Sequence, residues 1–89
     1  MRYRNRTEIT SQILETAMGG ATKTKIMYRA FLSYAQMKEY LEVLSANGLL
    51  ERNEKQMFTT TEKGIKFLKI YQELDKLAPQ ISNSGAMTL

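Results

Sequence analysis

The apolar pattern of this chain changes its period once, after residue 48, and that change most restricts the folds open to it. Before this point apolar residues recur every three or four positions, which is typical of helices that bury one face. From residue 49 to 60, two short runs of strand-forming residues flank a polar break, and the helical spacing then returns. The sequence therefore predicts three helices, a β-hairpin and a fourth helix, a mainly α fold with a small hairpin.

Local signals set the expected bounds of these elements. The first helix is expected from residue 5 or 7 to Met18, which faces inward, and two glycines end it. The second is expected from about residue 24 to 30. Ser33 and Gln36 form a capping box at the start of the third helix, and Asn47-Gly48 ends it. Strands at 49–52 and 56–60 form the hairpin.

The expected order is that of a winged helix-turn-helix domain, in which the second and third helices form the helix-turn-helix and the hairpin is the wing. A chain of 89 residues has room for one modest core. The expected division is a basic N-terminal arm at 1–6, the winged helix-turn-helix core at 7–61, a dimerisation helix at 62–78 ended by Pro79, and a flexible tail at 79–89.

Composition excludes most enzyme classes. The chain has no Cys and no His, which removes thiol nucleophiles, His-based acid–base pairs and nearly every transition-metal site. We therefore expect no catalysis and no cofactor. The sequence shows neither a membrane span nor the apolar core of a secretory signal, so we expect a cytoplasmic protein without a membrane partner.

Charge is polarised along the chain. Residues 1–38 hold seven of the 13 Lys and Arg but two of the nine Asp and Glu, a net +5, whereas residues 39–89 carry −1. Such polarity fits a protein with one face toward a polyanion, and double-stranded DNA is the partner expected here. A basic tail on an ordinary neutral domain is the alternative.

The first turn of the third helix is the expected base-reading element. Gln36 can pair with adenine and Lys38 can reach guanine in a major groove, whereas Glu39 and Glu42 would repel phosphates if the helix lay deeper. Tyr34 is a candidate phosphate donor, although packing against the second helix is favoured for it. The full set of expected DNA-binding residues is Arg2, Arg4, Arg6, Lys23, Lys25, Ser33, Tyr34, Gln36, Lys38, Arg52 and Lys55.

The supporting contacts come from three places. Lys23 and Lys25 stand at the start of the second helix, where free N–H groups and cations can hold a phosphate. Arg52 and Lys55 belong to the hairpin. The alternating arginines at positions 2, 4 and 6 can follow a DNA backbone or a narrow minor groove, and a solubilising tail is the alternative for them.

The fourth helix carries two apolar seams. Ile65 and Leu68 can close the core of the domain. The second seam consists of Phe67, Ile70, Leu74 and Leu77. So small a domain leaves no surface of its own for this seam to cover, unless both seams pack onto one broad internal face. We therefore expect a homodimer whose interface includes Phe67, Ile70, Tyr71, Leu74 and Leu77.

Several segments together resemble a known family: Thr24-Lys25-Ile26-Met27-Tyr28-Arg29-Ala30, Leu32-Ser33-Tyr34, Tyr40-Leu41, Gly48-Leu49-Leu50, Thr61-Glu62-Lys63-Gly64 and Phe67-Leu68. They are similar to archaeal winged-helix proteins, predicted transcriptional regulators that include small basic chromatin-type proteins dimerising through a C-terminal antiparallel coiled coil. The resemblance implies a winged helix-turn-helix fold, DNA as partner and a homodimer. Pro79 departs from the coiled-coil members and favours a compact dimer over a long stalk.

Three functions follow as hypotheses. The first is a transcriptional regulator that binds double-stranded DNA as a dimer. The second is an architectural chromatin protein of low sequence specificity, since the third helix offers few base-reading side chains. The third is a winged helix used for protein–protein interaction, which the acidic residues Glu39, Glu42, Glu51 and Glu54 favour.

Overall fold

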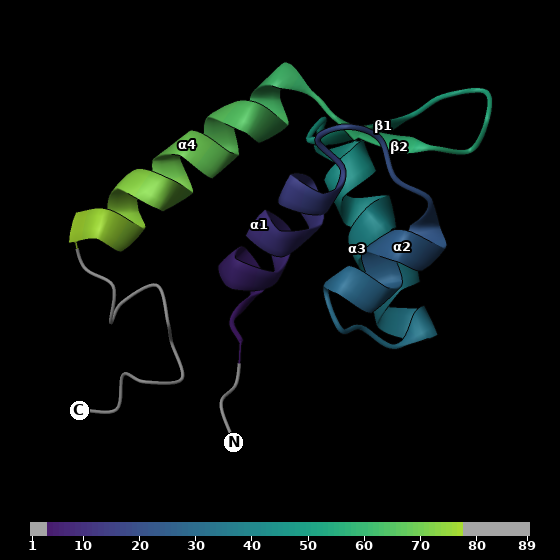
Figure 1. Ribbon diagram of the computed structural model, residues 1–89, viewed down its shortest axis with the longest axis horizontal. Helices are drawn as coiled ribbons and strands as arrows, with labels where there is room; N and C mark the ends of the chain where they lie inside the picture. Colours follow the sequence, from purple (N-terminus) through teal and green to yellow (C-terminus); the bar gives the residue numbers. More distant parts are fainter. Residues whose placement is uncertain (1–3, 78–89) are drawn as a thin grey trace.

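The computed structural model describes residues 4–77, so Arg2, Pro79 and the proposed tail at 79–89 lie outside the described residues. Figure 1 shows the mainly helical arrangement that the sequence predicts, confirming the winged helix-turn-helix order. No helix within residues 4–77 is long and apolar enough to cross a membrane. The elements are α1 (Arg6–Thr16), α2 (Lys23–Arg29), α3 (Tyr34–Ala46), β1 (Leu50–Arg52), β2 (Phe58–Thr60) and α4 (Glu62–Leu77).

Side-chain caps begin the first three helices. Asn5, Thr22 and Ser33 each accept a hydrogen bond from the backbone N–H three residues later, at 2.7 to 3.1 Å. The Ser33 N–H in turn donates to Oε1 of Gln36 at 3.0 Å, which confirms the capping box. These bonds satisfy N–H groups that have no partner inside a helix, and they fix where α3 begins.

The second and third helices end in the same left-handed motif. At the end of α3, Gly48 has a φ of 77° and the next N–H, that of Leu49, donates back to the carbonyl of Leu44 at 2.9 Å. At the end of α2 the N–H of Leu32 donates in the same way to the carbonyl of Met27, at 3.0 Å, but the left-handed residue is Phe31, with a φ of 54°. A side chain in this conformation costs about 1 to 2 kcal/mol, so Phe31 is a strained position where glycine would be relaxed.

The hairpin is fastened to the helix-turn-helix by a third extended segment. Strands β1 and β2 are antiparallel, with Leu50 opposite Thr60 and Arg52 opposite Phe58. Ala21, between α1 and α2, exchanges two backbone hydrogen bonds with Phe58 at 2.8 and 2.9 Å. The hairpin therefore keeps a fixed position beside α2 and α3.

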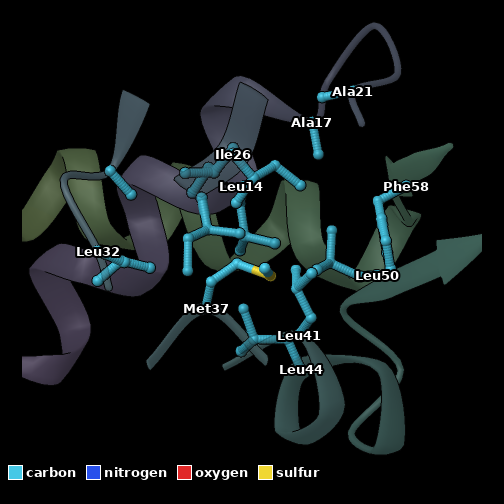
Figure 2. Packing of buried hydrophobic residues seen from close by; sticks show 13 residues of the cluster. Leu14, Ala17, Ala21, Ile26, Leu32, Met37, Leu41, Leu44, Leu50 and Phe58 are labelled. Atoms are coloured by element: carbon cyan, nitrogen blue, oxygen red, sulfur yellow. The ribbon is translucent and has the colours of Figure 1, made fainter. Parts of the chain in front are cut away.

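One hydrophobic core joins the helices to the hairpin. Figure 2 shows Met37 from α3 among side chains of α1 and α2, with Leu50 and Phe58 closing one end. Met37, Leu41 and Leu44 are buried, as the helical spacing of α3 predicts. The inward orientation expected for Met18 is wrong: α1 ends at Thr16, and Met18 lies half exposed in the turn that follows.

The fourth helix begins against the hairpin and then leaves the core. The Thr61 hydroxyl accepts from the Gly64 N–H at 3.1 Å and starts the helix. Gly64 lies so close to the segment before β1 that a Cβ there would be 2.5 Å from the Leu49 carbonyl oxygen. Leu68 is buried, while the later turns of α4 project away from the other helices (Figure 1).

Candidate nucleic-acid interface

A groove of about 760 Å³ lies between α3, the start of α2 and the hairpin. Figure 1 shows the hairpin loop extending away from α4, so this side of the molecule is clear of the last helix. Positions 34, 38 and 45 of α3 recur at helical spacing along its wall. The groove is lined by Lys23, Tyr34, Met37, Lys38, Leu41, Glu42, Ser45, Arg52 and Phe58.

An aromatic ring with two ammonium groups marks the helical side of the groove. Lys23 Nζ lies 6.0 Å and Lys38 Nζ 5.6 Å from the centre of the Tyr34 ring. Tyr34 lies beside Lys23 of α2, but it is 55% exposed, so its packing against the second helix is at the surface and not in the core. Lysine ammonium groups remain hydrated at the surface of a protein, so the Tyr34 ring that lies beside two of them remains at the surface as well.

The hairpin supplies the opposite cation. Arg52 leaves β1 with its guanidinium carbon 5.9 Å from the centre of the Phe58 ring on β2. Glu42 is the one carboxylate among the lining residues, so three cations outnumber it along the groove. This arrangement favours an anionic ligand that is long enough to contact both α3 and the hairpin.

Ser33 and Gln36 are exposed, but each side chain is already engaged in the helix cap. Oε1 of Gln36 accepts from the Ser33 N–H, and the Ser33 hydroxyl accepts from the Gln36 N–H at 3.1 Å. A bidentate contact of Gln36 with adenine needs that same oxygen as an acceptor. The amide nitrogen of Gln36 remains as its donor toward a ligand.

Comparison with known proteins identifies the fold family. A family model described as winged helix-turn-helix matches residues 3–79. The chain belongs to the winged helix-turn-helix family. In this family's terms α3 is the recognition helix and the β1–β2 hairpin is the wing. The family and fold that the sequence predicts are thus confirmed.

Two proteins similar to this chain in sequence or in fold are archaeal, as the resemblance implies. An uncharacterized protein of Methanocaldococcus jannaschii is 35% identical over 72 residues, which are 80% of this chain and 73% of that protein. The crystal structure of Sso10a-2, a DNA-binding protein from Sulfolobus solfataricus, matches with a TM-score of 0.76 at 24% identity. That match covers 91% of this chain and 88% of the Sulfolobus chain, and it shows a shared fold.

The remaining basic candidates within the described residues lie outside the groove. Lys25 on α2 and Lys55 in the turn of the wing are exposed but do not line the groove. Arg6 is the first residue of α1 and lines a separate pocket of about 160 Å³ that also contains Glu39. Arg4 bonds the Gln12 side chain and donates to the Phe31 carbonyl at 3.0 Å, so it lies beside the turn between α2 and α3.

The expected dimer seam divides into a covered part and an open part. Phe67 is half-buried against the core of its own domain, and Tyr71 is half-buried as well. Ile70, Leu74 and Leu77 are exposed at spacings of four and three residues on the projecting part of α4. Phe67 therefore packs mainly within its own domain, because the start of α4 lies against the core.

Sequence reasoning missed part of the groove wall. Ser45 shares the groove face of α3 with Lys38, seven residues earlier, a spacing that would have pointed to it. Phe58 has no such signal, because its place depends on the pairing of β2 with β1 and with Ala21.

Proposed function

We propose that this winged helix binds double-stranded DNA through the groove between α3 and the wing, as a dimer, and acts as a transcriptional regulator. The observation that carries the proposal is the groove itself, where Lys23, Lys38 and Arg52 come from three different elements. Sso10a-2, which shares the fold, is a DNA-binding protein. A chromosomal partner of this kind also agrees with a cytoplasmic location.

In the proposed complex the first turn of α3 enters a major groove about 12 Å wide. Lys38 is then placed to reach guanine, and the exposed Tyr34 hydroxyl can donate to a phosphate. Lys23 and Arg52 contact phosphates on either side. Affinity comes mainly from these cations and falls with salt, while base preference comes from Lys38 and its neighbours.

A second candidate is an architectural DNA-binding protein with little sequence preference. The capping box favours it, because the bond from the Ser33 N–H to the amide oxygen of Gln36 holds that side chain against the helix end and limits its reach toward a base. Both candidates use the same groove, so they differ only in how strongly binding depends on the base sequence.

Selection of bound fragments from a random DNA pool tests the function and separates the two candidates. A regulator yields an enriched motif for the wild type, and Lys38→Ala shifts that motif. Lys25→Ala is the control, since Lys25 lies at the start of α2 outside the groove and its loss leaves the motif unchanged. Enrichment without a motif supports the architectural role. Absence of any duplex binding contradicts the proposal and favours a protein-interaction module.

We further propose that dimerisation occurs through Ile70, Leu74 and Leu77 of α4. Three exposed apolar side chains on one seam favour pairing with a second copy, and a two-fold dimer would set the recognition helices about one DNA turn, roughly 34 Å, apart. Tyr71 and Phe67 border this seam.

Sedimentation tests the dimer. The double variant Ile70→Glu, Leu74→Glu is expected to be a folded monomer with weaker duplex binding, since charges in an apolar interface are strongly unfavourable. The control Lys69→Glu, Gln72→Glu changes two exposed positions on another face of the same helix and should stay dimeric. A wild type that is monomeric at tens of micromolar would refute the dimer.

A further inference from the structure

A second surface, apart from the groove, lies at the turn between α2 and α3. Two aromatic rings are exposed there, Tyr28 at 70% and Phe31 at 81%. Neither lines the groove. We call this surface the aromatic turn and define it by Lys25, Tyr28, Arg29, Phe31 and Arg4.

Cations are interleaved with the rings of the aromatic turn. Lys25, Tyr28 and Arg29 stand at i, i+3 and i+4 on the exposed side of α2. The guanidinium carbon of Arg4 lies 6.0 Å from the centre of the Phe31 ring, and the same side chain donates to the Phe31 carbonyl. Residues 16–38 contain four Lys and Arg and no Asp or Glu, so this stretch carries only positive charge.

The backbone at Phe31 indicates that the ring has a use other than folding. The same left-handed position at the end of α3 is occupied by Gly48, which is relaxed there. At the end of α2 the chain places a phenyl ring in the strained conformation and leaves it in solvent. Strain of this kind, together with exposure, is characteristic of positions that bind a partner.

We propose that the aromatic turn binds single-stranded nucleic acid, a function beyond duplex recognition in the groove. In a duplex the faces of the bases are stacked on one another, whereas a single strand exposes them to flat aromatic rings. Tyr28 and Phe31 stack on bases, while Lys25, Arg29 and Arg4 contact the phosphates between them. A purely apolar protein partner would leave these cations unmatched, so the charge favours the polyanion.

Binding of a fluorescein-labelled oligothymidylate of about twelve nucleotides tests this proposal on the full chain. Phe31→Gly removes the ring and keeps the fold, because glycine adopts the left-handed conformation without strain. Each of Phe31→Gly and Tyr28→Ala is expected to weaken single-strand binding by about 5- to 150-fold. Circular dichroism confirms that each variant is folded.

Duplex binding is measured in parallel, and it separates this proposal from the groove. Phe31→Gly leaves duplex affinity within about twofold of the wild type, because the ring lies outside the groove. The control Val43→Ala trims a half-exposed apolar side chain on α3, outside the aromatic turn, and leaves single-strand binding unchanged. Quenching of tyrosine fluorescence by the bound strand, lost in Tyr28→Ala, reports stacking directly.

Three results would overturn the proposal. The first is that the wild type does not bind the oligothymidylate. The second is that folded Phe31→Gly and Tyr28→Ala bind it as tightly as the wild type does. Equal losses for duplex and single strand would assign the rings to the duplex surface instead. If the wild type binds the single strand but not the duplex, the proposal of duplex binding in the groove is refuted and that of single-strand binding at the aromatic turn is supported.

Discussion

Gly64→Ala is expected to destabilise the protein, although the same change in an exposed helix interior stabilises by about 1 kcal/mol. A Cβ at Gly64 would lie 2.5 Å from the Leu49 carbonyl oxygen and 2.5 Å from Cγ2 of Thr60. Ordinary van der Waals contact of a Cβ begins at 3.4 Å, so the start of α4 must move by nearly an ångström. The Leu49 oxygen belongs to the backbone and cannot rotate away.

The magnitude follows from these two opposing effects. Overpacking a tight contact costs up to about 3 kcal/mol, and the better helix propensity of alanine returns about 1 kcal/mol. The net loss is therefore about 2 kcal/mol, which lowers the Tm of a domain of this size by about 8 to 16 °C. Thermal unfolding followed by circular dichroism measures the shift.

Gly19→Ala is the matched control. Nothing lies within 4 Å of a Cβ built at Gly19, and its φ is outside the left-handed region. Its Tm should equal or slightly exceed that of the wild type. If Gly64→Ala melts at or above the wild-type temperature, then α4 does not approach the segment before β1 as closely as described, and the account of how the helix is seated is wrong.

Two further predictions concern the core and the groove. Leu44→Ala should lower the free energy of unfolding by about 2 to 5 kcal/mol in urea titration, because Leu44 is buried in the only core within residues 4–77, and an unchanged midpoint would contradict that burial. Glu42→Gln removes the one carboxylate among the groove-lining residues and should tighten duplex binding about two- to fivefold by fluorescence anisotropy, whereas weaker binding would mean that Glu42 contacts the DNA favourably.

The fold was predictable because its signals are local. The capping box of Ser33 and Gln36 and the left-handed Gly48 both act within a few residues, and the structure has them where the sequence predicts them. The apolar spacing of α3 likewise identified Met37 and its neighbours as core. Local chemistry therefore suffices for the order and the ends of most elements.

The site was less predictable because it depends on contacts between distant segments. The wing takes its position from bonds between Ala21 and Phe58, which are 37 residues apart in the chain, and that position decides which face of α3 forms the groove. The position of Arg4, which donates to the carbonyl of Phe31, depends on the turn between α2 and α3, and no sequence pattern indicates the geometry of that turn. The left-handed position of that turn is occupied by Phe31, so the glycine that usually indicates such a turn in a sequence is missing.

The salt dependence of duplex binding tests the central claim most directly. The double variant Lys23→Ala, Arg52→Ala removes two groove cations from each protomer, and Lys69→Ala, Lys76→Ala removes the same charge from exposed positions on α4 that lie away from the proposed dimer seam. If the groove holds the DNA, each protomer of the groove pair loses two phosphate contacts, so the slope of log K against log salt for the dimer falls in magnitude by about four units. The slope stays near the wild-type value for the α4 pair. Equal changes for both pairs, or no change for the groove pair, would contradict the claim.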